Sequence, residues 1–307
     1  MGIRDSGNLE KPEPQGRTDQ FSEYRSLLFS IAYRMLGSVA DAEDMVQETF
    51  IRWQASSDEI RSPRAFLVTI VSRLCINHLQ SARVQREQYI GQWLPEPLLT
   101  GVGNDPYEIS RTDESLSMAF LVLLERLTPT ERAVFLLREV FDYEYSEIAA
   151  IIGQNEASCR QILRRARQHV ADVRPRFDAS QKQHEQLLHQ FLDAASNGNL
   201  DALVALLSSQ VVFHSDGGGK SAAVPNLVYG PDKVARAILG GLTKLVPKNL
   251  VSRMAQINGK PGVVSYLNGR AYSVVTIDIA DGHVRSIFIV TNPEKLSRLP
   301  ALPPAPC

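Results

Sequence analysis

The chain has few cysteines and no long hydrophobic run, and these absences exclude several classes of protein. Three cysteines occur among 307 residues, an odd number spread widely along the chain. This spacing excludes a disulfide framework or a zinc site and indicates a reducing compartment. The strongest apolar run, Leu116–Leu124, is far shorter than the roughly 20 residues that a membrane-spanning helix needs. We therefore expect a cytoplasmic protein with no membrane span, no metal site and no cofactor.

The two ends of the chain also lack the patterns of ordered or targeting segments. The N-terminal stretch is polar and has no apolar segment of the kind that a secretory signal peptide contains. Prolines interrupt it, and we expect disorder as far as about Asp19. The tail Pro300–Pro306 is rich in proline and is expected to be disordered as well.

Net charge is low, and the formal value of −1 by itself argues against a nucleic-acid partner. The distribution of charge argues the opposite. Residues 61–86 contain five arginines and no acid, residues 156–176 contain six arginines and two acids, and residues 38–51 contain four acids and no base. Two basic stretches and one acidic stretch predict two contacts with DNA and one contact with a basic protein. A solvated helix face is the alternative for each stretch taken alone.

The stretch Tyr145–Val170 has the pattern of a helix-turn-helix. A short apolar helix, with Ser146 as its expected cap, ends at Gly153, and a longer helix with arginines along one face follows. The second helix of such a motif enters the major groove, where arginine pairs with guanine and glutamine with adenine. The DNA-contacting candidates on this helix are Ser158, Arg160, Gln161, Arg164, Arg165 and Arg167.

These candidates differ in the contact that we expect. Base contacts are expected from Arg160, Gln161 and Arg164, and phosphate contacts from Ser158 and Arg165. An acid on the same domain is the alternative partner for Arg167. On the opposite face, Cys159 is either a small core residue or a redox switch.

Helix-start signals divide the rest of the N-terminal half. Ser38 followed by Asp41 resembles a capping box, and the helix after it runs to about Gln54. A second helix is expected over Ser62–Arg86, which opens with a serine cap and a proline. Thr128–Glu131 combines a cap, a first-turn proline and a capping-box glutamate in a second helical block. Between the blocks lies a linker rich in proline and glycine, whose string WLPEP suggests a docking element.

From about Ser180 the pattern changes to helices followed by alternating strands. Hairpin turns are expected at Asn258-Gly259 and Asp281-Gly282. This block predicts an α+β domain with a curved antiparallel sheet. The expected strands are Val211–His214, Leu250–Ile257, Val263–Leu267, Ala271–Ile279 and Val284–Val290.

In order and spacing these motifs resemble the extracytoplasmic-function sigma factors of bacterial RNA polymerase. DAEDMVQETFIRW (Asp41–Trp53) is similar to the region 2 helix that docks on the polymerase, and Ser62–Arg83 to the helix that opens and reads the −10 element. Leu127–Gly153 and the helix after it resemble region 4, which reads the −35 element. The resemblance implies a factor that binds core RNA polymerase and promoter DNA and initiates transcription of a specific gene set.

The resemblance also assigns residues. Arginines supply salt-dependent affinity for phosphate, and an acidic helix with aromatic anchors suits a protein interface. Core packing is the alternative for Phe50, and a plain surface position for Asn77. Gln80 stands where relatives often carry arginine, and the loop Ala55–Arg61 is placed near the opened strand. The −10 candidates are Arg64, Arg73, Asn77, Arg83 and Arg86. The polymerase-binding candidates are Asp41, Asp44, Gln47, Glu48, Phe50 and Trp53.

The remainder resembles a SnoaL-like domain, a cone-shaped α+β fold, and three strings are similar to those of the SigJ-like subgroup that carries this fusion. Glu294 stands where the subgroup usually has aspartate. The fusion implies that the attached domain regulates the two DNA-binding blocks in place of a separate anti-sigma protein, in a chain that is a monomer when free. The strings are Trp93, Leu94, Pro95, Glu96 and Pro97; Asp216, Gly217, Gly218, Gly219 and Lys220; and Asn292, Pro293, Glu294, Lys295 and Leu296.

Other functions remain open at this point. An ordinary helix-turn-helix regulator would bind duplex DNA as a dimer and would not need the acidic helix. In the last domain, His214, Asp216, Tyr266 and His283 could line a pocket for acid–base catalysis or for a small-molecule ligand. Core or rim positions are the alternative, and no spacing defines a nucleophile, so we expect no enzyme.

The expected fold is therefore multidomain, with two all-α sigma domains and a C-terminal α+β cone-shaped SnoaL-like domain. The helix-turn-helix belongs to the second of the all-α domains. The expected ranges are 1–19 for a disordered N-terminus, 20–88 for region 2, 89–112 for the linker, 113–177 for region 4, 180–297 for the regulatory domain and 298–307 for a disordered tail.

Overall fold

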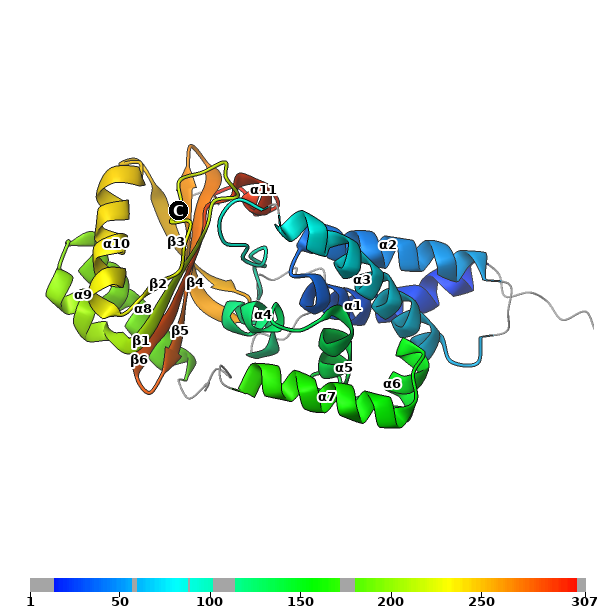
Figure 1. The fold of residues 1–307 in the computed structure, drawn as a ribbon. Coiled ribbons are helices and arrows are strands. Elements are labelled where there is room, and N and C mark those ends of the chain that lie inside the picture. Colours follow the sequence, from blue (N-terminus) through cyan, green and yellow to red (C-terminus); the bar gives the residue numbers. More distant parts are fainter. Residues whose placement is uncertain (1–13, 57–59, 88, 102–113, 172–179, 303–307) are drawn as a thin grey trace, which may run out of the picture.

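The computed structural model describes the chain except for residues 1–13, 57–59, 88, 102–113, 172–179 and 303–307, and except for the side chains of residues 14–15, 82–87, 114, 171 and 243–245. Figure 1 shows a group of helices from the N-terminal half beside a six-stranded sheet from the C-terminal part. The expected fold class, helical blocks followed by an α+β domain, is confirmed. Within the described ranges, no helix combines the length and hydrophobicity that a membrane span needs.

The first helical block consists of α1 (Pro14–Leu36), α2 (Val39–Ala55) and α3 (Pro63–Glu87). Gly37 ends α1 in the left-handed conformation, with φ 66°, and Ser38 then caps α2 as expected. The disorder expected as far as Asp19 is wrong from residue 14 onward, because the first turns of α1 are held against α2. Arg17 donates a hydrogen bond to the backbone oxygen of Trp53 at 3.0 Å.

The second helical block consists of η1 (Glu114–Leu116), α4 (Met118–Leu124), α5 (Pro129–Glu139), α6 (Tyr145–Ile152) and α7 (Glu156–Ala171). The capping box expected at the start of α5 is present, with the Thr128 hydroxyl accepting from the Glu131 N–H and the Glu131 carboxylate accepting from the Thr128 N–H. Gly153 ends α6 with φ 70°. Glu144, rather than the expected Ser146, is the N-cap of α6.

The C-terminal domain contains α8 (Gln181–Ser196), α9 (Leu200–Leu206), α10 (Pro231–Leu245), α11 (Pro293–Leu296), β1 (Leu207–Asp216), β2 (Val228–Tyr229), β3 (Val251–Ile257), β4 (Lys260–Leu267), β5 (Arg270–Ala280) and β6 (His283–Val290). The strand order is β2-β1-β6-β5-β4-β3. Strands β1 and β6 are parallel, so the sheet is mixed and not wholly antiparallel as expected. Both expected hairpin turns are present, with Asn258 at φ 53° and Asp281 at φ 51°.

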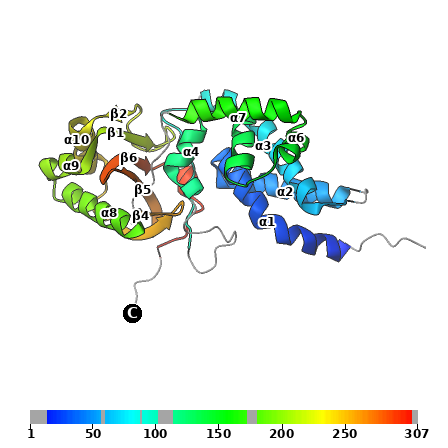
Figure 2. The same cartoon turned by 90° about the horizontal axis from the view of Figure 1, so that it is seen from below.

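Three hydrophobic clusters hold the molecule together. The first is continuous through both helical blocks, so α1–α3 and α5–α7 share one core. The second lies between α8–α10 and one face of the sheet. The third fills the opposite face, where α4, α11 and the linker pack (Figure 2), and it includes Leu94, Met118, Tyr266, Phe288 and Leu296.

The tail expected to be disordered is partly ordered. Leu299 and Leu302 pack against the third cluster, and the Leu302 N–H donates to the oxygen of Gly269 at 2.9 Å. The expectation is therefore wrong for residues 298–302, because the leucine side chains of this segment pack against the sheet.

Candidate functional sites

The recognition helix α7 has one buried face and one basic face. Cys159, Leu163 and Ala166 are each at most 1% exposed. Gln161, Arg164 and Arg165 are exposed, as are Arg160 and Arg167. The two faces that the sequence predicts are therefore present, and the basic one is exposed to solvent.

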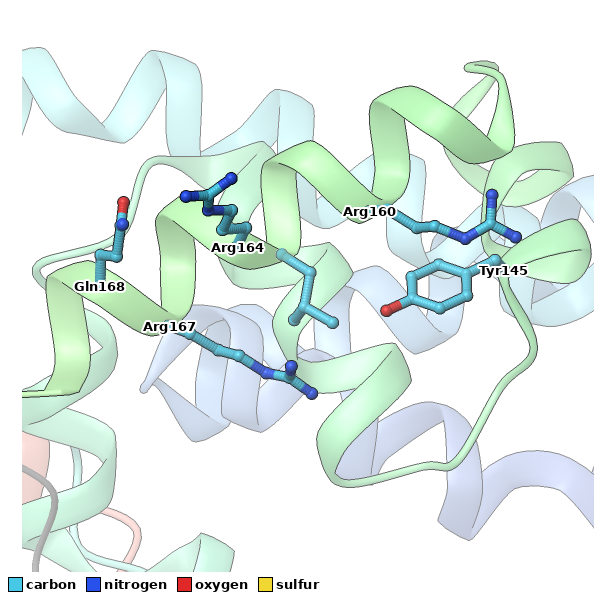
Figure 3. A pocket seen from close by; sticks show the side chains of 6 residues that line it. Tyr145, Arg160, Arg164, Arg167 and Gln168 are labelled. Carbon is cyan, nitrogen blue, oxygen red and sulfur yellow. The ribbon is translucent and has the colours of Figure 1, made fainter.

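Arg160 is held in position by two neighbours. Its guanidinium forms an ion pair with Glu156, one turn earlier, at 2.7 Å. Its Cζ lies 4.9 Å from the ring centroid of Tyr145, at the start of α6. Figure 3 shows this ring beside the guanidinium, with Arg164 further along the helix. Sequence reasoning missed Tyr145, although an aromatic residue in the first turn of the motif was a visible signal.

Other residues of α7 have contacts within their own domain. Arg167 forms an ion pair with Glu139 at 2.6 Å, so the acidic partner that the sequence left open for it exists. The N–H of Ser158 donates to the Asn155 side chain at 2.8 Å. Burial raises the pKa of the Cys159 thiol, which disfavours the reactive thiolate and favours the packing role over a redox switch.

The basic helix α3 faces the helix-turn-helix. Arg73 donates from Nε to the oxygen of Ile151 at 2.7 Å and from Nη2 to that of Ala150 at 3.0 Å. The guanidinium of Arg64 lies 5.1 Å from the ring centroid of Tyr143. The last carbonyls of a helix lack partners within it and carry partial negative charge. Arg73 therefore binds the partial negative charge at the C-terminal end of α6, as it would bind a phosphate.

The remaining −10 candidates lie farther along α3. Asn77 and Gln80 are exposed. The side chains of Arg83 and Arg86 lie outside the described residues, as does the centre of the loop Ala55–Arg61. Only the position of these arginines on the last turns of α3 is therefore established.

Helix α2 presents part of the expected acidic surface. Asp44 and Gln47 are exposed, and Asp41 is half-buried. Glu48 pairs with Arg52 at 2.7 Å across one turn of the helix. A line of polar and acidic side chains therefore faces outward, as the sequence predicts.

The two aromatic residues expected on this surface point toward the core instead. Trp53 is 2% exposed, and its indole N–H donates to the oxygen of Arg17 at 2.9 Å. Phe50 is half-buried and packs edge-on against Phe21, with ring centroids 4.9 Å apart. The assignment of Trp53 to the surface is wrong, because the helical period places it on the buried face. The large apolar side chain that α2 exposes is that of Ile51, at 53%, which sequence reasoning missed.

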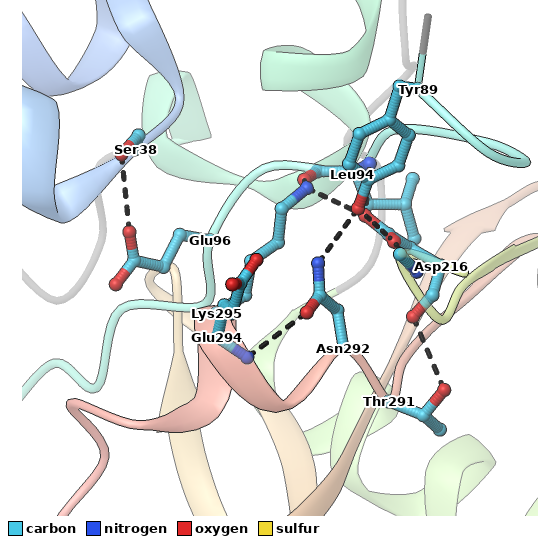
Figure 4. Close-up of polar contacts among 10 residues, drawn as sticks. Ser38, Tyr89, Leu94, Glu96, Asp216, Thr291, Asn292, Glu294 and Lys295 are labelled. Atoms are coloured by element: carbon cyan, nitrogen blue, oxygen red, sulfur yellow. Dashed lines mark hydrogen bonds and ion pairs between the residues drawn. The ribbon is translucent and has the colours of Figure 1, made fainter. Parts of the chain in front are cut away.

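Asp216, at the end of β1, binds the linker with a fully buried carboxylate (Figure 4). It accepts from the Tyr89 hydroxyl at 2.6 Å, from the Leu94 N–H at 2.8 Å and from the Gly218 N–H at 3.0 Å. Lys295 Nζ lies 2.6 Å from its second oxygen. Four donors around one carboxylate compensate the cost of burying its charge.

Lys295 joins the three sequence strings. Its Nζ lies over the Trp93 ring, 4.2 Å from the centroid, and donates to the oxygen of Leu94. Asn292 Nδ2 donates to the Tyr89 hydroxyl at 2.8 Å, and burial raises the pKa of that hydroxyl. We call this group the linker site: Tyr89, Trp93, Leu94, Asp216, Asn292 and Lys295.

The other end of WLPEP is attached to the first helical block. The carboxylate of Glu96 accepts from the N–H groups of Val39 at 2.8 Å and Ala40 at 3.4 Å, so it lies at the positive end of α2. The Glu96 N–H donates to the backbone oxygen of Gly37 at 2.7 Å, and the Tyr33 hydroxyl donates to the backbone oxygen of Glu96 at 2.6 Å. The linker is therefore hydrogen-bonded on both sides.

Two further contacts join the C-terminal domain to the helices. Asn258 donates to the Tyr33 hydroxyl at 2.6 Å and accepts from the Leu98 N–H at 3.1 Å. Arg298 pairs with Glu43 on α2. The sequence indicated only a hairpin turn at Asn258, since its side-chain partners lie far away in the chain.

The four residues considered for catalysis do not meet. His214 stacks on Phe288, with ring centroids 4.8 Å apart, on the side of the sheet that faces α4. Tyr266 is buried in the third cluster, His283 is exposed at a hairpin, and Asp216 serves the linker. The expectation of a shared pocket is wrong. Side chains alternate along a strand, so the residues on either side of His214 in β1 face α8 and α10, whereas His214 itself faces α4.

Family models match both helical blocks, and individual proteins match most of the chain. Residues 20–84 match the family "Sigma-70 region 2", and residues 117–170 match "Sigma-70, region 4". The chain is 37% identical to the ECF RNA polymerase sigma factor SigJ of Mycobacterium tuberculosis, over 92% of this chain and 93% of that protein. It is 34% identical to the probable ECF sigma factor SigI of the same organism, over 91% and 94%.

A solved structure agrees. The crystal structure of M. tuberculosis SigJ has a TM-score of 0.76 and 36% identity, and the match covers 91% of this chain and 98% of that chain. It therefore spans the helical blocks, the linker and the C-terminal domain. On this similarity the chain belongs to the extracytoplasmic-function sigma factors of RNA polymerase, and it is similar to their SigJ-like subgroup.

Proposed function

We propose that this sigma factor initiates transcription in an opened form, and that the described arrangement is a restrained form held by the C-terminal domain. The observation that carries the proposal is the contact of Arg73 with α6. Arg73, which is expected to contact the −10 element, is hydrogen-bonded instead to the block that is expected to contact the −35 element.

The separation of the promoter elements supports an opening. Elements named −35 and −10 lie about 25 base pairs apart, which is roughly 85 Å of duplex at about 3.4 Å per base pair. In the described arrangement α3 and α6 share one hydrophobic core with α5 and α7. Both blocks cannot contact their elements together until this shared core separates.

In the opened form each block presents its basic helix to DNA. Arg160, Gln161 and Arg164 read bases of the −35 element. Arg64, Arg73 and Asn77, with Arg83 and Arg86, contact the −10 element, and the arginines supply affinity that falls with salt. The DNA-binding surface is therefore divided between two helices that the restraint holds together.

The restraint also lies beside the proposed polymerase surface. Asp44, Gln47 and Ile51 face outward on α2 and form that surface, with Glu48. Arg298 pairs with Glu43 on the same helix, while Glu96 lies at its N-terminus. Polymerase binding to α2 thus competes with contacts that hold the linker.

The C-terminal domain has a restraining and not a catalytic role. His214 and Tyr266 are used in packing, and Asp216 is used in the linker site. The factor acts on polymerase and promoter DNA in the bacterial cytoplasm, and it is a monomer when free. The linker is held at high effective concentration, because the domain is part of the same chain.

Run-off transcription with bacterial core polymerase tests this function. The wild-type chain is expected to give core-dependent, promoter-specific transcripts. Lys295→Met removes the charge that pairs with buried Asp216 and is expected to raise the transcript yield. Lys220→Met is the matched control, because Lys220 pairs with Glu294 at the surface, where both side chains are more than half exposed.

Each result separates the two parts of the proposal. Equal yields from wild type and Lys295→Met would contradict the restraint. Absence of transcripts from all three proteins, with retained binding to duplex DNA, would contradict initiation itself.

A further inference from the structure

A cavity of about 540 Å³ lies between α8, α10 and the sheet, on the face of the sheet away from the linker. Its body is lined by apolar side chains from both layers, among them Leu192, Phe213, Ile238, Val275 and Ile289. This volume lies in the range of small-molecule sites, which are concave, mostly apolar and contain a few polar groups.

The polar groups of the cavity are arranged by depth. Charged and ionisable residues of the lining, His189, Asp193 and Arg253, are exposed at its mouth. Buried residues of the lining carry hydroxyl groups, including those of Ser215 and Ser273, which are 4% and 9% exposed. A ligand in the body of the cavity therefore meets apolar walls and neutral hydrogen-bonding groups.

The mouth also exposes large apolar side chains to solvent. Leu242 on α10 and Met254 on β3 line the cavity and are 38% and 42% exposed. Among the described residues only seven large hydrophobic side chains are exposed, so two at one opening form a local apolar rim. Exposed apolar surface at the edge of a concavity marks a site of ligand entry.

We infer that this cavity binds an uncharged, mostly apolar small molecule with a hydroxyl or carbonyl group, and that the bound molecule strengthens the linker site. The second part rests on the proposed restraint. Ligand binding then favours the closed form and lowers initiation.

The inner wall of the cavity is the reverse side of the linker site. Ser215 lines the cavity and the next residue, Asp216, binds the linker. Thr291 lines the cavity and the next residue, Asn292, binds Tyr89. The Thr291 N–H donates to the oxygen of Asp216 at 2.8 Å, which joins the two segments.

The direction of the effect follows from linkage. A molecule that fits the cavity in this shape binds the closed form more tightly than it binds a form in which the inner wall of the cavity has moved. It therefore stabilises the backbone that carries Asp216 and Asn292. Hydrogen exchange of the linker amides, such as that of Leu94, slows as a result.

Two adjacent glycines in α10 provide a matched pair of variants. A Cβ atom built on Gly240 or on Gly241 meets no heavy atom within 4 Å. Gly241 lines the cavity, and Gly240 is outside its lining. Gly241→Phe fills the cavity, whereas Gly240→Phe makes the same change to the same helix without filling it. Ala237→Leu, one turn earlier on the lining face, is a milder filling variant in case Gly241→Phe does not fold.

The first measurement is binding of N-phenyl-1-naphthylamine, an uncharged apolar probe, to the full chain by fluorescence titration. Saturable binding is expected for the wild type and for Gly240→Phe, with affinities within about twofold. Gly241→Phe is expected to bind about tenfold more weakly or not at all. Absence of saturable binding to the wild type, or equal binding by both glycine variants, overturns the site.

The second measurement is hydrogen–deuterium exchange of peptides that cover residues 89–101, with and without the probe. The probe is expected to slow this exchange in the wild type and in Gly240→Phe, but not in Gly241→Phe. Binding with unchanged exchange in these peptides overturns the coupling. Neither result bears on the restraint itself, which the transcription yield of Lys295→Met decides separately.

Discussion

Lys295 Nζ lies 2.6 Å from Oδ2 of Asp216, and the two residues are 79 positions apart in a site where the carboxylate is fully buried. Removal of one partner leaves the other charge buried without compensation. We expect Lys295→Met and Asp216→Asn each to lower the free energy of unfolding by about 3–5 kcal/mol. The double variant should cost far less than the sum, which urea unfolding of the full chain will measure. Additive losses would show that the pair does not interact as its geometry indicates.

Gly37 is expected to control the position of the linker tryptophan. Its φ is 66°, and a Cβ atom there would lie 2.7 Å from the ring of Trp93. Gly37→Ala should therefore add a clash to a backbone cost of about 1–2 kcal/mol, displace the ring and shift its emission to longer wavelength. The measurement uses a Trp53→Phe background, since the chain has only two tryptophans.

Gly153→Ala is the control for this displacement. Its φ is 70°, and the nearest atom to its added Cβ is 3.7 Å away on Arg73. The backbone cost is thus similar, but the Trp93 emission should stay unchanged. Equal emission shifts from both variants would attribute the effect to general destabilisation.

Tyr145 is expected to position Arg160 for DNA. A cation–π contact at an exposed site contributes about 0.5–1 kcal/mol, so Tyr145→Ala should weaken binding to a −35 duplex by roughly twofold to fivefold. Tyr145→Phe keeps the ring face and should bind like the wild type. Binding isotherms at one salt concentration test this, and a loss in Tyr145→Phe would assign the effect to the hydroxyl instead.

Two buried groups in the C-terminal domain oppose each other in their pH dependence. Burial lowers the pKa of His184 from 6.5 to about 4, so the unfolded chain takes up that proton first and stability falls as the pH falls through this window. Burial raises the pKa of Asp278 from 3.8 to about 6, so the folded chain binds that proton first and stability falls as the pH rises between these values.

Single variants should therefore reveal opposite slopes. Each group contributes about 2–3 kcal/mol across its window, and the two largely cancel in the wild type. Asp278→Asn should expose a steep loss of stability toward pH 4, and His184→Gln should expose a loss toward pH 6. Urea midpoints at pH 4.5 and pH 6.5 measure both slopes, and parallel slopes in the two variants would contradict the assignment.

Local sequence signals predicted much of the fold, because they depend on neighbours in the chain. The caps at Ser38 and Thr128 and the left-handed end of α6 at Gly153 lie where expected. The turn at Asn258 is also present. Each of these needs only a few consecutive residues with a specific backbone conformation or side-chain acceptor.

What the sequence did not predict depends on tertiary placement. His214 faces α4 because of which helices cover each side of the sheet. The alternation of side chains along β1 does not by itself decide which side that is. The parallel pairing of β1 with β6 needs a crossover of many residues. The hydrogen bond from the Trp53 indole to the backbone oxygen of Arg17 depends on the placement of α1 against α2. The three strings were visible as candidates, but their common carboxylate at Asp216 required the fold.

The sequence distance between the linker and the residues that hold it has a consequence during synthesis. Leu94 accepts from Lys295 across 201 positions. At about 5–20 residues per second, a ribosome needs roughly 10–40 s to travel that far. From the time that Ala171, the last residue of α7, is made until Lys295 is made, both DNA-binding blocks exist without their restraint. A newly made chain therefore meets polymerase first in its unrestrained form.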